Sequence, residues 1–303
     1  MNVLVTGGAG LIGMALRSAL AGRGHAVTAI DITDFGRGDA DLKIVGLEDR
    51  AGLEGLITEK GIEAILHCGA ISGPMMAKGQ PLYLVEVNID GAAMLLDLAR
   101  VNHMRRFVFC SSISVYGDVG AATITEDTPL RPTSVYGATK VACEQLIRGF
   151  AAEYGLEGVS LRIARVYGPY RRANCHLGSM IRDAGAGRVT EIPCDPQFIY
   201  HYVHVDDVAE ALIVALEAEA LPAREYNVGS GQALTMPEIA EIARDAVAGA
   251  AVRLAPGADD VPDVQTAFDV SRIARDLGWR PRLDLSSGLK SYRQAIEAGR
   301  AAP

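Results

Sequence analysis

Tyr136 and Lys140 have residue types and a spacing suited to proton transfer. They stand four positions apart in a stretch after Pro132 that reads as a helix, and residues four apart share one helix face. An isolated phenol is a poor base because its pKa is about 10, but a neighbouring ammonium favours the phenolate. An exposed helix turn also produces this spacing by chance, so the pair alone is a hypothesis that Tyr136 is an acid/base.

Ser112 strengthens that hypothesis. It follows an apolar run, 107–110, that reads as a buried strand. Open α/β sheets bind ligands at the carboxyl ends of their strands, where a hydroxyl can hydrogen-bond a substrate oxygen. Taken alone, Ser112 is more often a strand-end hydroxyl without a function. Together with the pair it predicts three catalytic residues, Ser112, Tyr136 and Lys140.

A glycine-rich turn near the N-terminus predicts a dinucleotide site. Gly7, Gly10 and Gly13 follow a strand-like run and open a helical stretch. Gly7 would permit a sharp turn, Gly10 the approach of backbone amides to a pyrophosphate, and Gly13 close packing of helix on strand. The first helical amides, including those of Leu11 and Ile12, would face the phosphates.

Asp31 indicates which dinucleotide binds. It ends the second strand-like run, where a carboxylate can hydrogen-bond the adenosine ribose and would repel a 2′-phosphate. The sequence therefore favours NAD over NADP, although Arg37 lies close enough to argue the other way. With NAD bound, Tyr136 would take a hydroxyl proton while the carbon-bound hydrogen leaves as hydride.

The elements that position these residues alternate between strand and helix. Such alternation builds parallel βαβ units, with helices on both faces of one sheet. After residue 168 the composition shifts to Gly, Pro, Arg and Cys, which reads as a loop-and-helix insertion before further helices. Strands are predicted at 2–6, 26–31, 64–68, 106–110 and 159–163, and helices at 11–23, 88–101, 136–154, 206–218 and 235–248.

Composition argues against several classes of protein. The chain has 303 residues and a net charge of −8, which argues against a nucleic-acid or membrane partner. Five scattered cysteines without a Cys-x-x-Cys pair argue against a disulfide framework and favour a cytoplasmic protein. His201 and His204 have no carboxylate or cysteine at metal-ligand spacing, so we expect no metal.

In this order along the chain, the motifs resemble the extended short-chain dehydrogenases/reductases of the NAD-dependent epimerase/dehydratase family. The resemblance implies a Rossmann-type doubly wound parallel sheet with a smaller C-terminal α/β substrate-binding domain. It also implies NAD as the cofactor, a carbohydrate-like substrate and a homodimer. The other matching motifs are His67–Ala70, Asn88, Leu161–Arg162, Val166–Pro169, Val205–Val208, Tyr226–Gly229 and Leu277–Pro281.

The resemblance also implies roles and domain boundaries. Tyr136 is then the acid/base, Lys140 binds the nicotinamide ribose, and Ser112 holds the reacting oxygen. Residues 1–166 form the NAD-binding Rossmann domain, to which 197–226 return, while 167–196 and 227–303 form the substrate-binding domain. Four further residues are expected to contact the cofactor, namely Cys68, Gly69, Ala70 and Asn88.

Four departures from the family pattern direct the substrate prediction. Ile113 and Ser114 stand where the family's 4,6-dehydratases carry Asp-Glu, so we expect no dehydratase. Arg165 replaces an Asn, and Tyr200 replaces an Arg that pairs with the diphosphate of nucleotide sugars. Gly46 replaces an Asp that contacts adenine.

These departures favour a dehydrogenase that transfers hydride between NAD and a hydroxyl-bearing carbon of a sugar or sugar acid without a nucleotide. The alternative is a nucleotide-sugar 4-epimerase with tightly bound NAD, which uses the same three catalytic residues. A catalytically inactive dinucleotide sensor is disfavoured because all three are kept. Arg171 and Arg172 extend a cationic stretch that begins at Arg165, and the expected substrate contacts are Ser72, Ser112, Arg165, Tyr167 and Tyr200.

Overall fold

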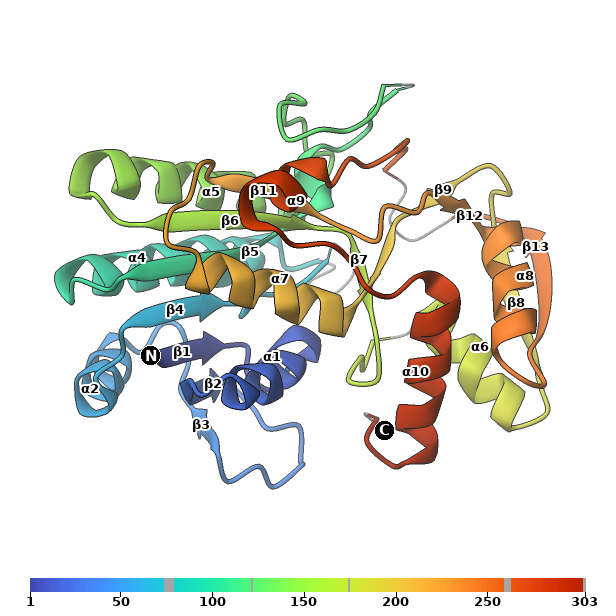
Figure 1. The fold of residues 1–303 in the computed structure, drawn as a ribbon, viewed down its shortest axis with the longest axis horizontal. Helices are drawn as coiled ribbons and strands as arrows, with labels where there is room; N and C mark the ends of the chain where they lie inside the picture. The colour runs from blue at the N-terminus through green and yellow to red at the C-terminus, as the bar shows by residue number, and fades with distance from the viewer. Residues whose placement is uncertain (74–78, 121, 174, 259–262, 302–303) are drawn as a thin grey trace.

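The computed structural model describes residues 1–73, 79–120, 122–173, 175–258 and 263–301. Its largest element is a seven-stranded sheet in which every neighbouring pair is parallel (Figure 1). The spatial order is β11-β6-β5-β4-β1-β2-β3, so the chain reverses direction across the sheet between β1 and β4. The strands are β1 (Asn2–Thr6), β2 (Ala26–Asp31), β3 (Leu42–Ile44), β4 (Ala64–His67), β5 (Arg106–Ser112), β6 (Gly158–Ile163) and β11 (Glu225–Val228).

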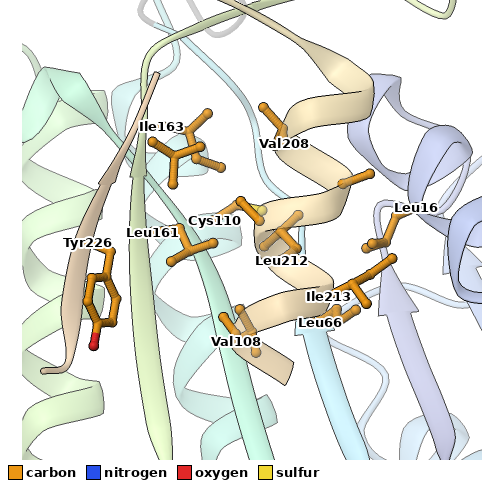
Figure 2. Close-up of a cluster of buried hydrophobic side chains, with 14 of the residues drawn as sticks. Leu16, Leu66, Val108, Cys110, Leu161, Ile163, Val208, Leu212, Ile213 and Tyr226 are labelled. Atoms are coloured by element: carbon orange, nitrogen blue, oxygen red, sulfur yellow. The ribbon is translucent and has the colours of Figure 1, made fainter. Parts of the chain in front are cut away.

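The sheet is buried on both faces, which is why its strands are apolar along their length. Successive strand residues point to opposite faces, so Val3 and Val5 join one core cluster while Leu4 joins the other. Figure 2 shows the first cluster, in which Leu212 of α7 (Val205–Glu217) packs over Val108 of the sheet. On that face α1 (Leu11–Gly22) lies beside α7.

The opposite face carries α2 (Arg50–Lys60), α4 (Gly91–Val101) and α5 (Val135–Tyr154). The ends of α5 follow local chemistry. The Ser134 hydroxyl accepts a hydrogen bond from the Gly137 amide at the N-terminus, and Gly155 adopts a left-handed conformation at the C-terminus. Before α4, the short α3 (Pro81–Val85) runs into a π-helical turn, η1 (Glu86–Asp90).

A smaller lobe follows the sheet and has its own apolar cluster. Figure 1 shows α6, α8 and α10 of this lobe at the end of the molecule away from α2. Three two-stranded sheets, β10-β7, β12-β9 and β13-β8, complete it. The elements are β7 (Arg165–Tyr167), α6 (His176–Gly185), β8 (Val189–Cys194), β9 (Ile199–Tyr200), β10 (Tyr202–His204), β12 (Leu234–Thr235), α8 (Met236–Ala246), β13 (Ala251–Pro256) and α10 (Leu285–Glu297), with α9 (Ser271–Leu277) back beside β11.

The predicted Rossmann-type sheet is confirmed. The helix expected over 88–101 is present, with a π-helical first turn that contains Asn88 and runs directly into α4. One local prediction was incomplete. The insertion expected at 168–196 also contains a strand, β8, besides α6. The proposed domain boundaries stay a prediction. Within the described ranges, no helix is both long and apolar enough to cross a membrane.

Candidate active site

The glycine-rich turn is a cradle that side chains would fill. Gly7 has a φ of +66°, and a Cβ there would lie 2.8 Å from Gly69 Cα. A Cβ on Gly13 would lie 2.1 Å from the Gly7 carbonyl oxygen, so only glycine permits α1 to start so close to the turn. Gly10, the N-cap of α1, is less crowded, and no side chain caps the helix. The free amides of this first turn, which include those of Leu11 and Ile12, suit a pyrophosphate.

Asp31 lies beside this cradle, at the carboxyl end of β2. Its carboxylate accepts hydrogen bonds from the Ala9 amide at 3.0 Å and the Ile32 amide at 2.8 Å. Arg37 approaches the same loop from the other side and donates to the Ala9 carbonyl oxygen at 2.9 Å. The residues present therefore fit NAD, with an anion cradle at α1 and a carboxylate at the position expected for the ribose.

The end of β4 forms the next part of this edge. Thr6 Oγ1 lies 2.7 Å from His67 Nδ1 and accepts from the Gly69 amide at 2.9 Å. The buried Asn88 side chain accepts from the Ile71 amide at 2.9 Å and donates to Thr139 Oγ1 at 3.1 Å. Predicted as a cofactor contact, Asn88 has its amide engaged in shaping the loop that contains Cys68, Gly69 and Ala70.

Tyr136 and Lys140 lie at the start of α5, where this helix packs against the end of β5 and the residues that follow Ser112. A Cβ on Gly137 would lie 2.5 Å from the Ser114 carbonyl oxygen, so this glycine lets the first turn of α5 approach the residues after Ser112. Lys140 Nζ donates to the Cys110 carbonyl oxygen at 2.8 Å and lies 5.7 Å from the centre of the Tyr136 ring. These two contacts hold the first turns of α5 against the carboxyl end of β5.

Gly137 and Thr139 were not among the site residues predicted from the sequence. A helix-breaking glycine in the first turn of a predicted helix, directly after Tyr136, was the available signal for a close approach. Nothing comparable pointed to Thr139, whose partner Asn88 lies 51 residues away.

The expected substrate contacts are distributed unevenly. Arg165 is half-buried, with its guanidinium carbon 5.0 Å from the centre of the Tyr200 ring and 5.7 Å from that of Phe198. Tyr200 itself is 1% exposed and stacks on Tyr202. Tyr167 is also 1% exposed, and burial raises the pKa of its phenol. Both tyrosines therefore belong to the core of the smaller lobe.

The other expected contact, Ser72, is exposed in the loop after β4. The sequence also singled out two histidines that are both buried. His204 Nδ1 accepts from the Asp206 amide at 3.2 Å and so caps α7. Burial lowers the pKa of His201 and His204. Over the described ranges, no cluster of three or more His, Cys, Asp or Glu side chains is arranged to hold a metal ion.

Of the two remaining arginines, Arg172 connects the two lobes. Arg171 Nη1 donates to the Val166 carbonyl oxygen at 2.8 Å. The Arg172 guanidinium carbon lies 4.2 Å from the centre of the Phe35 ring, in the loop after β2. β6 lies four strand positions from β2, a span of roughly 19 Å at about 4.8 Å per strand. The segment after β7 therefore crosses the sheet edge along which a dinucleotide would lie.

Comparison with known proteins gives consistent similarities. The model of the NAD dependent epimerase/dehydratase family matches residues 3–229. A UDP-glucose 4-epimerase of Corynebacterium glutamicum is 31% identical over 300 residues, which cover 93% of this chain and 91% of that protein. The structure of UDP-glucose 4-epimerase from Thermotoga maritima with UDP-glucose superposes with a TM-score of 0.88, at 26% identity and 99% coverage of both chains.

NAD, the predicted cofactor, is confirmed by these similarities. The UDP-glucose 4-epimerase of Thermus thermophilus was solved as a complex with NAD. It superposes with a TM-score of 0.86, at 28% identity, covering 98% of this chain and 99% of that chain.

Two functional expectations were wrong. The relatives carry the names of epimerases and dehydratases, which overturns the preference for a dehydrogenase. The exclusion of dehydratases is overturned too, because a dTDP-glucose 4,6-dehydratase of Neisseria meningitidis is 30% identical over 328 residues, covering 97% of this chain and 92% of that protein. Ile113 and Ser114 are each 7% exposed in a 3-10 turn, η2 (Ile113–Val115), so packing governs their identity and they carry little evidence about the reaction.

Proposed function

Because the chain belongs to the NAD-dependent epimerase/dehydratase family, we propose that it is a nucleotide-sugar 4-epimerase that keeps its NAD tightly bound. The observation that carries this proposal is that the start of α5, with Tyr136 and Lys140, packs against the end of β5, with Ser112, at the same sheet edge as the glycine cradle. Oxidation and reduction at one carbon require only one proton-transferring group beside the cofactor. The similarity to UDP-glucose 4-epimerases in sequence and in structure supports the same conclusion.

In this proposal, each of the three catalytic residues has a separate role. Bound NAD supplies a hydride acceptor that can return the hydride. Tyr136 accepts the proton of the sugar hydroxyl and later gives it back, while Ser112 Oγ holds the same oxygen. Lys140 favours the phenolate and binds the nicotinamide ribose. Inversion then requires the keto sugar to turn in the site between the two hydride transfers.

The smaller lobe would bind the nucleotide end of the substrate. Arg165 stands two residues after Ile163, which is in register with Ser112 on the neighbouring strand. Its guanidinium lies over the Tyr200 ring, an arrangement that presents the edge of the fork to an anion. We propose Arg165 as the diphosphate contact and Ser72 as a sugar contact, with Tyr167 and Tyr200 acting as packing behind them. The homodimer expected from the resemblance stays a prediction.

The test is to incubate the purified protein with UDP-glucose, without added NAD, and to follow the products by proton NMR. Appearance of UDP-galactose without net NADH is the expected result, and the matched Tyr136→Phe variant should form none. Parallel samples contain UDP-glucuronic acid, UDP-N-acetylglucosamine or dTDP-glucose. Conversion of dTDP-glucose to a 4-keto-6-deoxy sugar without epimerisation of any substrate would overturn the proposal, as would stoichiometric NADH release.

A further inference from the structure

Lys140 carries a buried ammonium whose surroundings differ from those of an ordinary ion pair. The residue is 4% exposed, and Nζ donates to the Cys110 carbonyl oxygen at 2.8 Å. Nζ also lies 4.6 Å from the centre of the Phe109 ring and 5.7 Å from that of Tyr136. No carboxylate of the described residues pairs with this ammonium. A buried charge is costly without a partner, and here two aromatic faces stand where a counter-ion would.

An aromatic ring and a carboxylate beside Lys140 would have different effects on the electrostatic field at Tyr136. A carboxylate beside Lys140 would neutralise the ammonium and cancel its field at the neighbouring phenol. The face of an aromatic ring attracts a cation through its quadrupole and adds no net charge. Phe109 can therefore hold the ammonium in place while leaving its positive charge available to the Tyr136 phenolate.

Phe109 is itself held firmly. It is 1% exposed near the end of β5, in register with His67 of β4, and the centres of the two rings lie 5.6 Å apart. Phe107 projects into the same cluster two residues earlier and contacts His67 at 6.0 Å. Two residues of a strand span roughly 6.6 Å, so Phe107 lies one repeat further back from the end of the sheet.

The other titratable groups around this ammonium are neutral near pH 7 or paired with a cation. Burial, and to a smaller extent Lys140, lowers the pKa of His67 to about 3. The hydrogen bond that the Cys68 and Cys110 thiols share, and burial, raise the pKa of Cys68, whose Sγ lies 3.4 Å from that of Cys110.

On α5, burial raises the pKa of the Cys143 thiol to about 11, so this thiol also stays protonated. The next residue, Glu144, is a carboxylate, but it is bound by the Arg162 guanidinium and the Ser111 hydroxyl. Lys140 is thus the cation that faces Tyr136 from this side.

We propose that Phe109 is a positioning residue of the active site, whose ring face holds the Lys140 ammonium beside Tyr136 without neutralising it. The catalytic consequence rests on the function proposed above. The placement of the ammonium rests on the geometry alone. Removing the ring should therefore raise the pH at which the phenolate forms, whatever the substrate proves to be.

The test compares Phe109→Leu with the control Phe107→Leu, which removes the same ring from the same cluster. Tyrosinate absorbance at 295 nm is titrated in each NAD-loaded variant without substrate, and the titration of the same variant carrying Tyr136→Phe is subtracted. We expect the midpoint to rise by about one pH unit for Phe109→Leu and by less than about 0.3 unit for Phe107→Leu. Equal shifts in both variants, or no shift in either, would overturn the proposal.

A second variant separates the ring's charge distribution from its volume. Pentafluorophenylalanine at position 109 keeps the shape of the ring and reverses the polarity of its face, so the midpoint should again rise. An unchanged midpoint would show that only packing matters and would overturn the proposal. The pH profile of epimerisation should shift with the titration. If no epimerase activity is found while the titration shifts as expected, the proposed function fails and the role of Phe109 stands.

Discussion

Replacing Glu144 by Gln should lower the free energy of unfolding by about 3–5 kcal/mol, because it leaves the Arg162 guanidinium buried without a counter-ion. Glu144 is 0% exposed and Arg162 2% exposed. Two guanidinium nitrogens donate to the carboxylate, Nη2 to Oε2 at 2.8 Å and Nε to Oε1 at 3.1 Å. Burial alone would lower the pKa of Arg162, but the hydrogen bonds and charge of Glu144 raise it.

The chain offers a matched control in Arg148 and Glu225. This pair has the same bidentate form, with nitrogen–oxygen distances of 2.6 and 2.7 Å. The Arg148 side chain is 52% exposed, so water can solvate its guanidinium when Glu225 is replaced. Glu225→Gln should therefore cost less than about 1 kcal/mol.

Equilibrium urea unfolding at pH 7 measures both changes, as shifts of the midpoint at constant slope. A third variant, Glu144→Leu with Arg162→Met, removes both charges together and should recover most of the lost stability. If Glu144→Gln and Glu225→Gln cost the same, burial does not set the energy of the Glu144–Arg162 pair and the reasoning is refuted. Failure of the double variant to recover stability would contradict it as well.

Four further outcomes are expected. Tyr136→Phe should abolish turnover with unchanged NAD affinity, measured by calorimetric titration, and undiminished activity would reject Tyr136 as the acid/base. Gly13→Ala places a Cβ 2.1 Å from the Gly7 carbonyl oxygen, so NAD affinity should fall at least about tenfold. Gly22→Ala meets no atom within 4 Å and should stabilise α1 by up to about 1 kcal/mol, seen by thermal denaturation. Burial, and to a smaller extent a nearby ammonium, lowers the pKa of His67 from 6.5 to about 3. The unfolded chain therefore binds an extra proton below pH 6.5, and stability should fall from there toward pH 3 by up to about 1.4 kcal/mol per unit. Urea unfolding of His67→Gln should show a shallower fall, and an unchanged slope would contradict this assignment.

Those parts of the site that depend on neighbours in sequence were predictable. The spacing of Gly7, Gly10 and Gly13 predicts the positions at which two backbone segments come close together. In the structure, a Cβ on Gly7 or Gly13 would clash with neighbouring backbone atoms, as predicted. The Tyr136–Lys140 spacing likewise follows from helix geometry. The alternation of apolar runs with helical stretches also predicted the parallel sheet, in which β4, β5 and β6 are buried on both faces.

Contacts between residues that are far apart in the sequence could not be predicted from spacing or periodicity. Asn88 meets Thr139 across 51 residues, and Arg165 meets Tyr200 across the segment that contains α6 and β8. A single sequence contains no signal for such pairs, because each partner alone fits many environments. The contact of Asn88 with the cofactor stays a prediction, and its bond to Thr139 was not foreseen.

The same limit explains why the dehydrogenase preference failed. It depended on Gly46, Arg165 and Tyr200, each interpreted as a changed ligand contact. In the structure Tyr200 is part of a buried ring stack, and the Arg165 guanidinium lies over the Tyr200 ring. The identities of Arg165 and Tyr200 therefore report local packing as much as ligand binding.

An epimerase differs from a dehydrogenase chiefly in how long it retains the reduced cofactor, and the identity of the catalytic residues does not determine this lifetime. In this fold, the contacts expected to affect the lifetime join segments that are distant in sequence. The segment after β7 carries Arg172 across the sheet edge to Phe35, and Asp31 and Arg37 bind the Ala9 backbone from two sides. We therefore expect retention of the cofactor to depend on the contacts between the two lobes. For this reason, the catalytic motifs predicted hydride transfer, while whole-chain similarity was needed to favour an epimerase or a dehydratase over a dehydrogenase.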